Sequence, residues 1–124
     1  MIIGSVLENH EIEKRISITP DIVKKYLSLG FEILLSENYG RHIGINDDEY
    51  LKLGVKISKD NQEILNSSDI LVQLGMLTDN QSSILKENQI LIGVLNPYDN
   101  KEKLENLAKK NINLFSLELL PRIT

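Results

Sequence analysis

The sequence contains no cysteine, which excludes disulfides, zinc–thiolate sites, iron–sulfur clusters and cysteine nucleophiles. Its two histidines, His10 and His42, are too few for a histidine-rich metal site, so we expect no metal. Either histidine offers a general base, but no partner residue stands at a sequence spacing that would indicate catalysis. A histidine in a polar loop is therefore the simpler interpretation of each. A G-x-G-x-x-G motif and a phosphate-binding loop are also missing, so we expect no complete nucleotide site within these residues.

Long hydrophobic runs and an excess of positive charge are lacking too. The longest apolar runs, such as residues 90–95, are far too short to cross a bilayer, and the first residues lack a signal-peptide pattern. The 14 basic and 18 acidic residues give a net charge of −4, whereas nucleic-acid binding needs a concentrated positive face. The remaining composition, 41% hydrophobic and 26% charged, is ordinary and predicts a single globular domain over residues 1–124.

Six short apolar runs alternate with segments of helical period. The runs predict strands at residues 2–7, 31–35, 55–57, 69–74, 89–95 and 112–117. The segments between them predict helices at residues 20–29, 47–53, 61–66, 78–86 and 101–110. Apolar strands separated by single helices predict an α/β fold, with a mainly parallel sheet of about six strands and helices on both faces. This is a Rossmann-like or flavodoxin-like unit without the glycine-rich fingerprint.

Several residues predict where the helices begin and end. Thr19 is suited to the N-cap of the first helix, Pro20 to its first position and Gly30 to its end. Asn46 is expected to cap the second helix. In the last helix, residues 104, 107 and 108 (two leucines and an alanine) are expected to face inward.

Ligands of a parallel α/β sheet bind beyond the carboxyl ends of its strands, a rule that selects the loops around Glu8, Gly75, Asn96 and Glu118. The missing side chain of Gly75 allows close approach by a ligand, although an ordinary turn also favours glycine. Asn96 offers a donor and an acceptor at this edge, or simply forms the turn that leads into the next helix.

Two arginines are further candidates. Arg15 carries a fork of donors suited to a carboxylate or phosphate, or forms a surface ion pair with Glu11 or Glu13. Arg122 either pairs locally with Glu118, four residues earlier, or points into a cleft that residues beyond this sequence complete.

A set of motifs runs in order along the whole chain. Residues 13–20 read E-K-R-I-S-I-T-P, residues 29–31 read L-G-F, and residues 48–54 read D-E-Y-L-K-L-G. Residues 69–71 read D-I-L and residues 117–124 read L-E-L-L-P-R-I-T. Together these motifs resemble the N-terminal domain shared by proton-translocating NAD(P) transhydrogenase alpha subunits and alanine dehydrogenases. The matching family patterns include E-x-R-V-A-x-T-P near the start and an arginine loop that continues R-A-Q-S-M-D after the end.

Two positions separate the branches of that family. Alanine dehydrogenases carry a lysine after the fourth strand and a histidine after the fifth, and these groups handle alanine or pyruvate. Gly75 and Asn96 stand at the matching positions here, and neither replaces an acid or a base. Residues 96–100, N-P-Y-D-N, resemble the transhydrogenase phrase W-P-A-Q-N-P with Asn96 in place of tryptophan. The resemblance therefore favours the transhydrogenase branch.

That resemblance implies a site and a reaction. The parent protein would bind NAD(H) and exchange hydride with NADP(H) held on a separate domain, without a catalytic acid or base from this chain. Arg122 matches an arginine that approaches the nicotinamide end of NAD in the family, with Ile123 and Thr124 beside it. Arg15 matches a position near the substrate of alanine dehydrogenases, and it joins Gly75, Asn96 and Glu118 as an expected cleft-lining residue.

The resemblance also implies partners. NADP-binding and membrane domains or subunits would couple hydride transfer to proton translocation, and the protein would form a homodimer on the cytoplasmic side of the inner membrane. We expect no nucleic-acid partner and no direct membrane insertion. Residues 1–124 would be the first subdomain of an NAD(H)-binding domain that continues past Thr124, inactive by itself. The alternatives are an amino-acid dehydrogenase of the alanine or saccharopine type and a non-catalytic α/β interaction domain.

Overall fold

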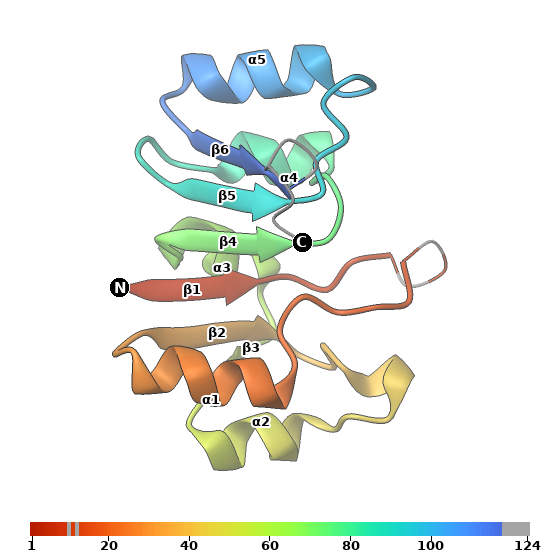
Figure 1. The fold of residues 1–124 in the computed structure, drawn as a ribbon, viewed down its shortest axis with the longest axis vertical. Coiled ribbons are helices and arrows are strands. Elements are labelled where there is room, and N and C mark those ends of the chain that lie inside the picture. The colour runs from red at the N-terminus through yellow and green to blue at the C-terminus, as the bar shows by residue number, and fades with distance from the viewer. Residues whose placement is uncertain (10, 12, 118–124) are drawn as a thin grey trace, which may run out of the picture.

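A computed structural model describes residues 1–9, 11 and 13–117 (Figure 1). Its six strands are β1 (Ile2–Ser5), β2 (Glu32–Ser36), β3 (Lys56–Ser58), β4 (Ile70–Gln73), β5 (Ile90–Gly93) and β6 (Asn113–Ser116). Its helices are α1 (Pro20–Ser28), α2 (Asp47–Leu53), α3 (Asn61–Ser67), α4 (Asp79–Ile84) and α5 (Lys101–Lys109), with a short 3-10 turn, η1 (Arg41–Ile43).

The strands form one sheet in the order β3-β2-β1-β4-β5-β6, and every neighbouring pair is parallel. All six predicted strands are present, and the α/β prediction is confirmed. The chain builds the sheet outward from β1 in one direction as far as β3, then returns to the other side of β1 with β4 and continues to β6. This reversal makes the gap beyond β1 and β4 the topological switch point of the sheet.

Helices cover both faces of the sheet, as predicted. In Figure 1, α1 and α2 lie in front of the strands, and α3 and α4 lie behind them. Each face has its own core, because successive side chains of a strand point to opposite faces. The front core contains Ile3, Ile18, Val23, Ile33, Leu35, Tyr39, Tyr50 and Val55. The rear core contains Val6, Leu34, Ile64, Leu65, Leu71, Leu77, Leu85, Leu91, Leu95, Leu107 and Ile112.

The first helix begins and ends as its sequence predicts. The Thr19 side chain accepts a hydrogen bond from the Ile22 amide at 3.4 Å, and Pro20 occupies the first helical position, where no amide hydrogen is needed. Past the last turn, Gly30 has a φ of +92°, a left-handed conformation that suits glycine. Asn46 does stand at the N-cap of α2, but its side chain makes no capping hydrogen bond.

The last helix differs from its prediction at one position. Leu107 is buried and Leu104 packs against the rear core, whereas Ala108 is exposed. Because α5 covers the outer end of the sheet, next to β6, only a narrow stripe of the helix contacts the core. The expectation that Ala108 faces inward was therefore wrong.

The front face is covered unevenly. Ile90 and Ile92 of β5 lie opposite Ile70 and Val72 of β4, which pack against the front core. Phe115 of β6 lies beside Ile92 and is 50% exposed. Neither isoleucine of β5 belongs to either core. Figure 1 shows none of the five described helices in front of this part of the sheet. The described residues thus leave an apolar strip along β5 and β6 partly exposed.

Candidate functional site

A pocket of about 380 Å³ lies at the switch point, where β1 and β4 end. This is the place at which open parallel sheets bind ligands. A second hollow, between α4 and α5, has a similar volume of about 330 Å³ but lies away from the strand ends. We therefore take the switch-point pocket as the candidate site. It is lined by Val6, Leu7, Glu8, Asn9, Glu13, Gln73, Gly75, Met76, Leu77, Thr78 and Gln81.

Gln73 fixes the floor of this pocket. The paired residues of β1 and β4 end at Gly4 and Leu71, and beyond them the Gln73 amide continues the connection. Its Oε1 accepts a hydrogen bond from the Val6 amide at 2.8 Å, and its Nε2 donates to the Val6 carbonyl at 3.1 Å. A buried amide whose donor and acceptor are both used holds two strands in register. Sequence reasoning missed this residue, although a glutamine inside an apolar strand was the available signal.

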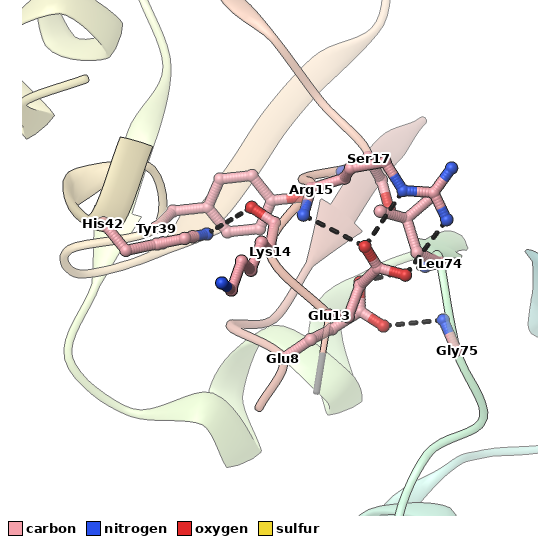
Figure 2. Close-up of polar contacts among 9 residues, drawn as sticks. All are labelled: Glu8, Glu13, Lys14, Arg15, Ser17, Tyr39, His42, Leu74 and Gly75. Atoms are coloured by element: carbon pink, nitrogen blue, oxygen red, sulfur yellow. Dashed lines mark hydrogen bonds and ion pairs between the residues drawn. The ribbon is translucent and has the colours of Figure 1, made fainter. Parts of the chain in front are cut away.

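Glu8 forms the side of the pocket nearest β4. Its two carboxylate oxygens accept hydrogen bonds from the successive amides of Leu74 and Gly75, at 2.9 and 2.6 Å (Figure 2). Partial burial raises the pKa of the Glu8 carboxyl, and the two amide hydrogen bonds work against that effect. The structure thus brings Glu8 and Gly75, two of the positions selected from the sequence, into direct contact.

Arg15 forms an ion pair with Glu13, two residues earlier in the chain. Its guanidinium donates to both carboxylate oxygens of Glu13, at 3.0 and 3.1 Å, and its side chain is 76% exposed (Figure 2). These hydrogen bonds lower the pKa of Glu13 to about 2. Glu13 lines the pocket and Arg15 does not. The geometry corresponds to the ion-pair alternative that the sequence left open.

Two buried tyrosines hold the loop that carries Glu13 and Arg15. The Tyr39 hydroxyl accepts from the amides of Ser17 and Ile18, at 3.2 and 3.3 Å, and shares a 2.8 Å hydrogen bond with Ser5 of β1. The Tyr50 hydroxyl donates to the Ile18 carbonyl at 2.8 Å. Burial raises the pKa of both phenols, so they stay neutral and act as hydrogen-bonding anchors. From the sequence, Tyr50 was noted only as part of the motif at residues 48–54, and Tyr39 was given no role.

His42 anchors the same loop. Its Nε2 lies 2.9 Å from the Lys14 carbonyl, to which it donates (Figure 2). His10, the other candidate base, falls outside the described residues. Within the described part of the chain, no group of three or more His, Asp or Glu side chains is arranged to hold a metal ion.

Asn96 shapes the turn after β5. It has a left-handed φ of 49°, its side chain donates to the Asp99 carboxylate at 2.8 Å, and its carbonyl accepts from the Asn100 amide at 3.1 Å. It is exposed and is not among the residues that line the pocket, so the geometry matches the turn alternative. The remaining predicted site residues, Glu118 together with residues 122–124, lie outside the described part of the chain.

Comparison with known proteins decides the family. Residues 4–124 match the family described as "Alanine dehydrogenase/PNT, N-terminal domain". The chain belongs to this family. The sequence-based resemblance is thereby confirmed over almost the whole length of the chain.

Members of the family show the same relationship at the level of single proteins. The chain is 35% identical over 128 residues to an NAD(P) transhydrogenase alpha-subunit protein of Rickettsia prowazekii, covering 100% of this chain and 33% of that protein. The protein of the same name from Rhodospirillum rubrum is 31% identical over 117 residues, covering 90% and 30%. The crystal structure of a transhydrogenase from Sinorhizobium meliloti superposes with a TM-score of 0.92 at 27% identity, covering 100% and 37%.

The alanine dehydrogenase/PNT N-terminal domain described here therefore spans about a third of the length of the curated relatives it matches. Among its described helices, none combines the length and the apolar character that a membrane-spanning helix requires.

Proposed function

We propose that this domain is the first α/β unit of the NAD(H)-binding alpha subunit of an NAD(P) transhydrogenase. It forms one wall of the cleft in which NAD(H) exchanges hydride with NADP(H) held on a separate domain. The observation that carries the proposal is the switch-point pocket, whose lining offers carboxylates, amides and apolar side chains but no lysine or imidazole among the described residues. Hydride transfer between two nicotinamides needs positioning rather than proton transfer by the protein.

The described residues fit one end of a dinucleotide. Met76 and Leu77 give the pocket an apolar wall, and Glu8 and Glu13 give it hydrogen-bond acceptors, a combination suited to a flat ring that carries a carboxamide. The nicotinamide ring supplies the hydride chemistry when it is bound. We further propose that Arg122, Ile123 and Thr124 contact this nicotinamide end, with Arg122 orienting it through its guanidinium donors.

The rest of the dinucleotide needs residues that this sequence does not contain. No glycine-rich phosphate motif is present, and the curated relatives are about three times longer. We propose that residues 1–124 act together with such a nucleotide-binding unit and are inactive by themselves. The same proposal includes a homodimer, NADP-binding and membrane partners that translocate protons, and a place on the cytoplasmic side of the inner membrane.

An amino-acid dehydrogenase is the second candidate, because the family also contains alanine dehydrogenases. That chemistry needs an acid or base near the substrate. Gly75 supplies none, and Asn96 is used in a turn outside the pocket. An assay of NAD-dependent oxidation of alanine separates the two candidates, and we expect no activity. A non-catalytic interaction domain predicts neither alanine oxidation nor NADH binding by the full natural subunit.

The test is NADH binding and hydride transfer by the full natural subunit with its NADP-binding partner. Arg122→Ala is expected to weaken NADH binding and slow hydride transfer by at least about tenfold, the effect of losing one charged hydrogen bond. Lys109→Ala, an exposed substitution on α5, is the matched control and should change neither. Unchanged affinity and rate in Arg122→Ala would rule out the assignment of Arg122. Calorimetry of the 124-residue chain should show that it binds NADH far more weakly than the full subunit.

A further inference from the structure

The switch-point pocket contains a ready-made anion site that the chain itself occupies. The amides of Leu74 and Gly75 are successive and point at one carboxylate, a backbone arrangement that binds anions. They lie directly after β4, where ligands bind in this class of sheet. The anion they hold is the side chain of Glu8, at 2.9 and 2.6 Å.

We propose that Glu8 is a specificity-determining residue: by occupying the amides of Leu74 and Gly75, its carboxylate excludes ligands that carry a carboxylate and leaves the cleft to an uncharged carboxamide. This inference rests on the proposed function and deepens it, since it concerns the group at the nicotinamide end of the cofactor. Glu8 acts on the choice of ligand and takes no part in moving the hydride.

The charges around the pocket support this exclusion. Glu8 and Glu13 both line it, and among the described lining residues there is no lysine or arginine. The nearby guanidinium of Arg15 donates to both oxygens of Glu13. A ligand carboxylate entering the pocket would therefore face two negative charges, and the guanidinium of Arg15 is already paired with Glu13. A carboxamide carries no charge, and its NH₂ group donates to carboxylate oxygens.

The chain also holds Glu8 in this position from both sides. Two residues earlier, the Val6 backbone is tied to β4 by two hydrogen bonds with the Gln73 side-chain amide. Across the contact, a Cβ on Gly75 would lie 3.3 Å from Glu8 Oε1, closer than most such contacts. The glycine thus leaves room for the carboxylate to approach the backbone, and a larger residue there would press on the carboxylate.

The first experiment tests the occupied anion site in the 124-residue chain. Acetate is titrated into ¹⁵N-labelled protein while the amide resonances of Leu74 and Gly75 are followed. The wild type should show no saturable shift there, and Glu8→Ala should bind acetate at these amides at least tenfold more tightly. Glu105→Ala on α5 makes the same charge change on an exposed helix and should behave like the wild type. Equal acetate binding by the wild type and Glu8→Ala would overturn the proposal.

Glu8→Gln keeps the experiment decisive if Glu8→Ala does not fold. A carboxamide has one oxygen to accept with, so one of the two amides is released, and we expect an acetate affinity between those of the wild type and Glu8→Ala. A folded variant of either kind that gains no acetate binding at residues 74 and 75 would also overturn the proposal.

The second experiment tests ligand choice in the full natural subunit. NAD is compared with its deamido analogue, which carries a carboxylate in place of the nicotinamide carboxamide. The wild type should prefer NAD, and Glu8→Ala should reduce that preference at least tenfold. An unchanged preference contradicts the role of Glu8 in specificity. If the subunit binds neither dinucleotide, the proposed function fails, whereas the acetate result still decides whether Glu8 blocks the anion site.

Discussion

The two halves of the sheet differ in how completely helices and loops cover their faces. The half formed by β1, β2 and β3 is covered by α1 and α2 in front and by α3 behind, and two tyrosines tie its loops to the core. The half formed by β4, β5 and β6 has a rear core, but no described helix lies in front of β5 and β6, where Phe115 is 50% exposed (Figure 1). The candidate pocket lies where the two halves meet. The first half thus provides a fixed wall, and the second offers an apolar surface beside it.

The largest expected effect is a difference in stability between substitutions in the two halves of the sheet. Leu35 is fully buried in the front core, so Leu35→Ala should lower the free energy of unfolding by about 2–5 kcal/mol. Phe115→Ala, on the open side of β6, should cost less than about 1 kcal/mol because half of the residue is already exposed to water. Urea unfolding followed by circular dichroism measures both. Equal losses would show that the second half is covered as completely as the first.

The next largest loss of stability is expected when the hydroxyl of Tyr39, in the first half, is removed. Tyr39→Phe removes the acceptor of the Ser17 and Ile18 amides and should cost about 1–3 kcal/mol, the penalty for unpaired buried groups. Hydrogen exchange at these two amides should also accelerate. Tyr98→Phe is the control, because that side chain is 90% exposed and its loss of a hydroxyl should cost less than about 0.5 kcal/mol.

Two glycines of the second half should respond differently to alanine. A Cβ on Gly93 would lie 2.2 Å from the Gln73 carbonyl oxygen of the neighbouring strand, so Gly93→Ala must push β4 and β5 apart. We expect a loss of about 1–3 kcal/mol in the free energy of unfolding. A Cβ on Gly75 meets the end of the Glu8 side chain at 3.3 Å, so Gly75→Ala should cost less. The reverse order in urea unfolding would contradict this expectation.

The smallest effect is electrostatic and concerns the two carboxylates of the pocket. The pKa of Glu13 is lowered to about 2 by Arg15, so its stabilising contribution is present above about pH 4.5 and is lost as the pH falls toward 2. The pKa of Glu8 is raised above 4.5 by burial, so its contribution is greatest below pH 4.5 and is lost as the pH rises.

Carboxyl ¹³C NMR across this range should therefore resolve two carboxylates that titrate on opposite sides of pH 4.5. Arg15→Gln should return the pKa of Glu13 toward 4.5, because it removes the partner that holds the charged form. Lys14→Gln changes the charge of the next residue and should leave Glu13 near its wild-type value. A Glu13 pKa unaffected by Arg15→Gln would show that the ion pair is absent in solution.

Much of the fold follows from local patterns. Apolar runs located all six strands, and Thr19 and Gly30 located the ends of α1, because such signals act over a few residues. Asn46 did not form the expected cap bond, although its residue type favours one. Local preference sets which residues suit a position, and tertiary contacts set which bonds form.

Less of the candidate site could be predicted from the sequence. The rule about strand ends selected Glu8 and Gly75, and the structure places them in contact. Gln73 and Tyr39 were missed because their partners are distant: Gln73 bonds to a residue 67 positions away, and Tyr39 to residues 21 to 34 positions away. Such pairs cannot be matched without knowing the strand order.

The central position of β1 has a consequence for synthesis of the protein. Among the six described strands β1 is made first, but its bond to β4 through Val6 and Gln73 joins residues 67 positions apart. At about 5–20 residues per second, one edge of β1 remains unpaired for roughly 3–13 s after it is made. During that interval β1 can pair with β2, so the half that anchors the pocket is able to assemble first. The middle of the finished sheet is therefore its outer edge in the nascent chain.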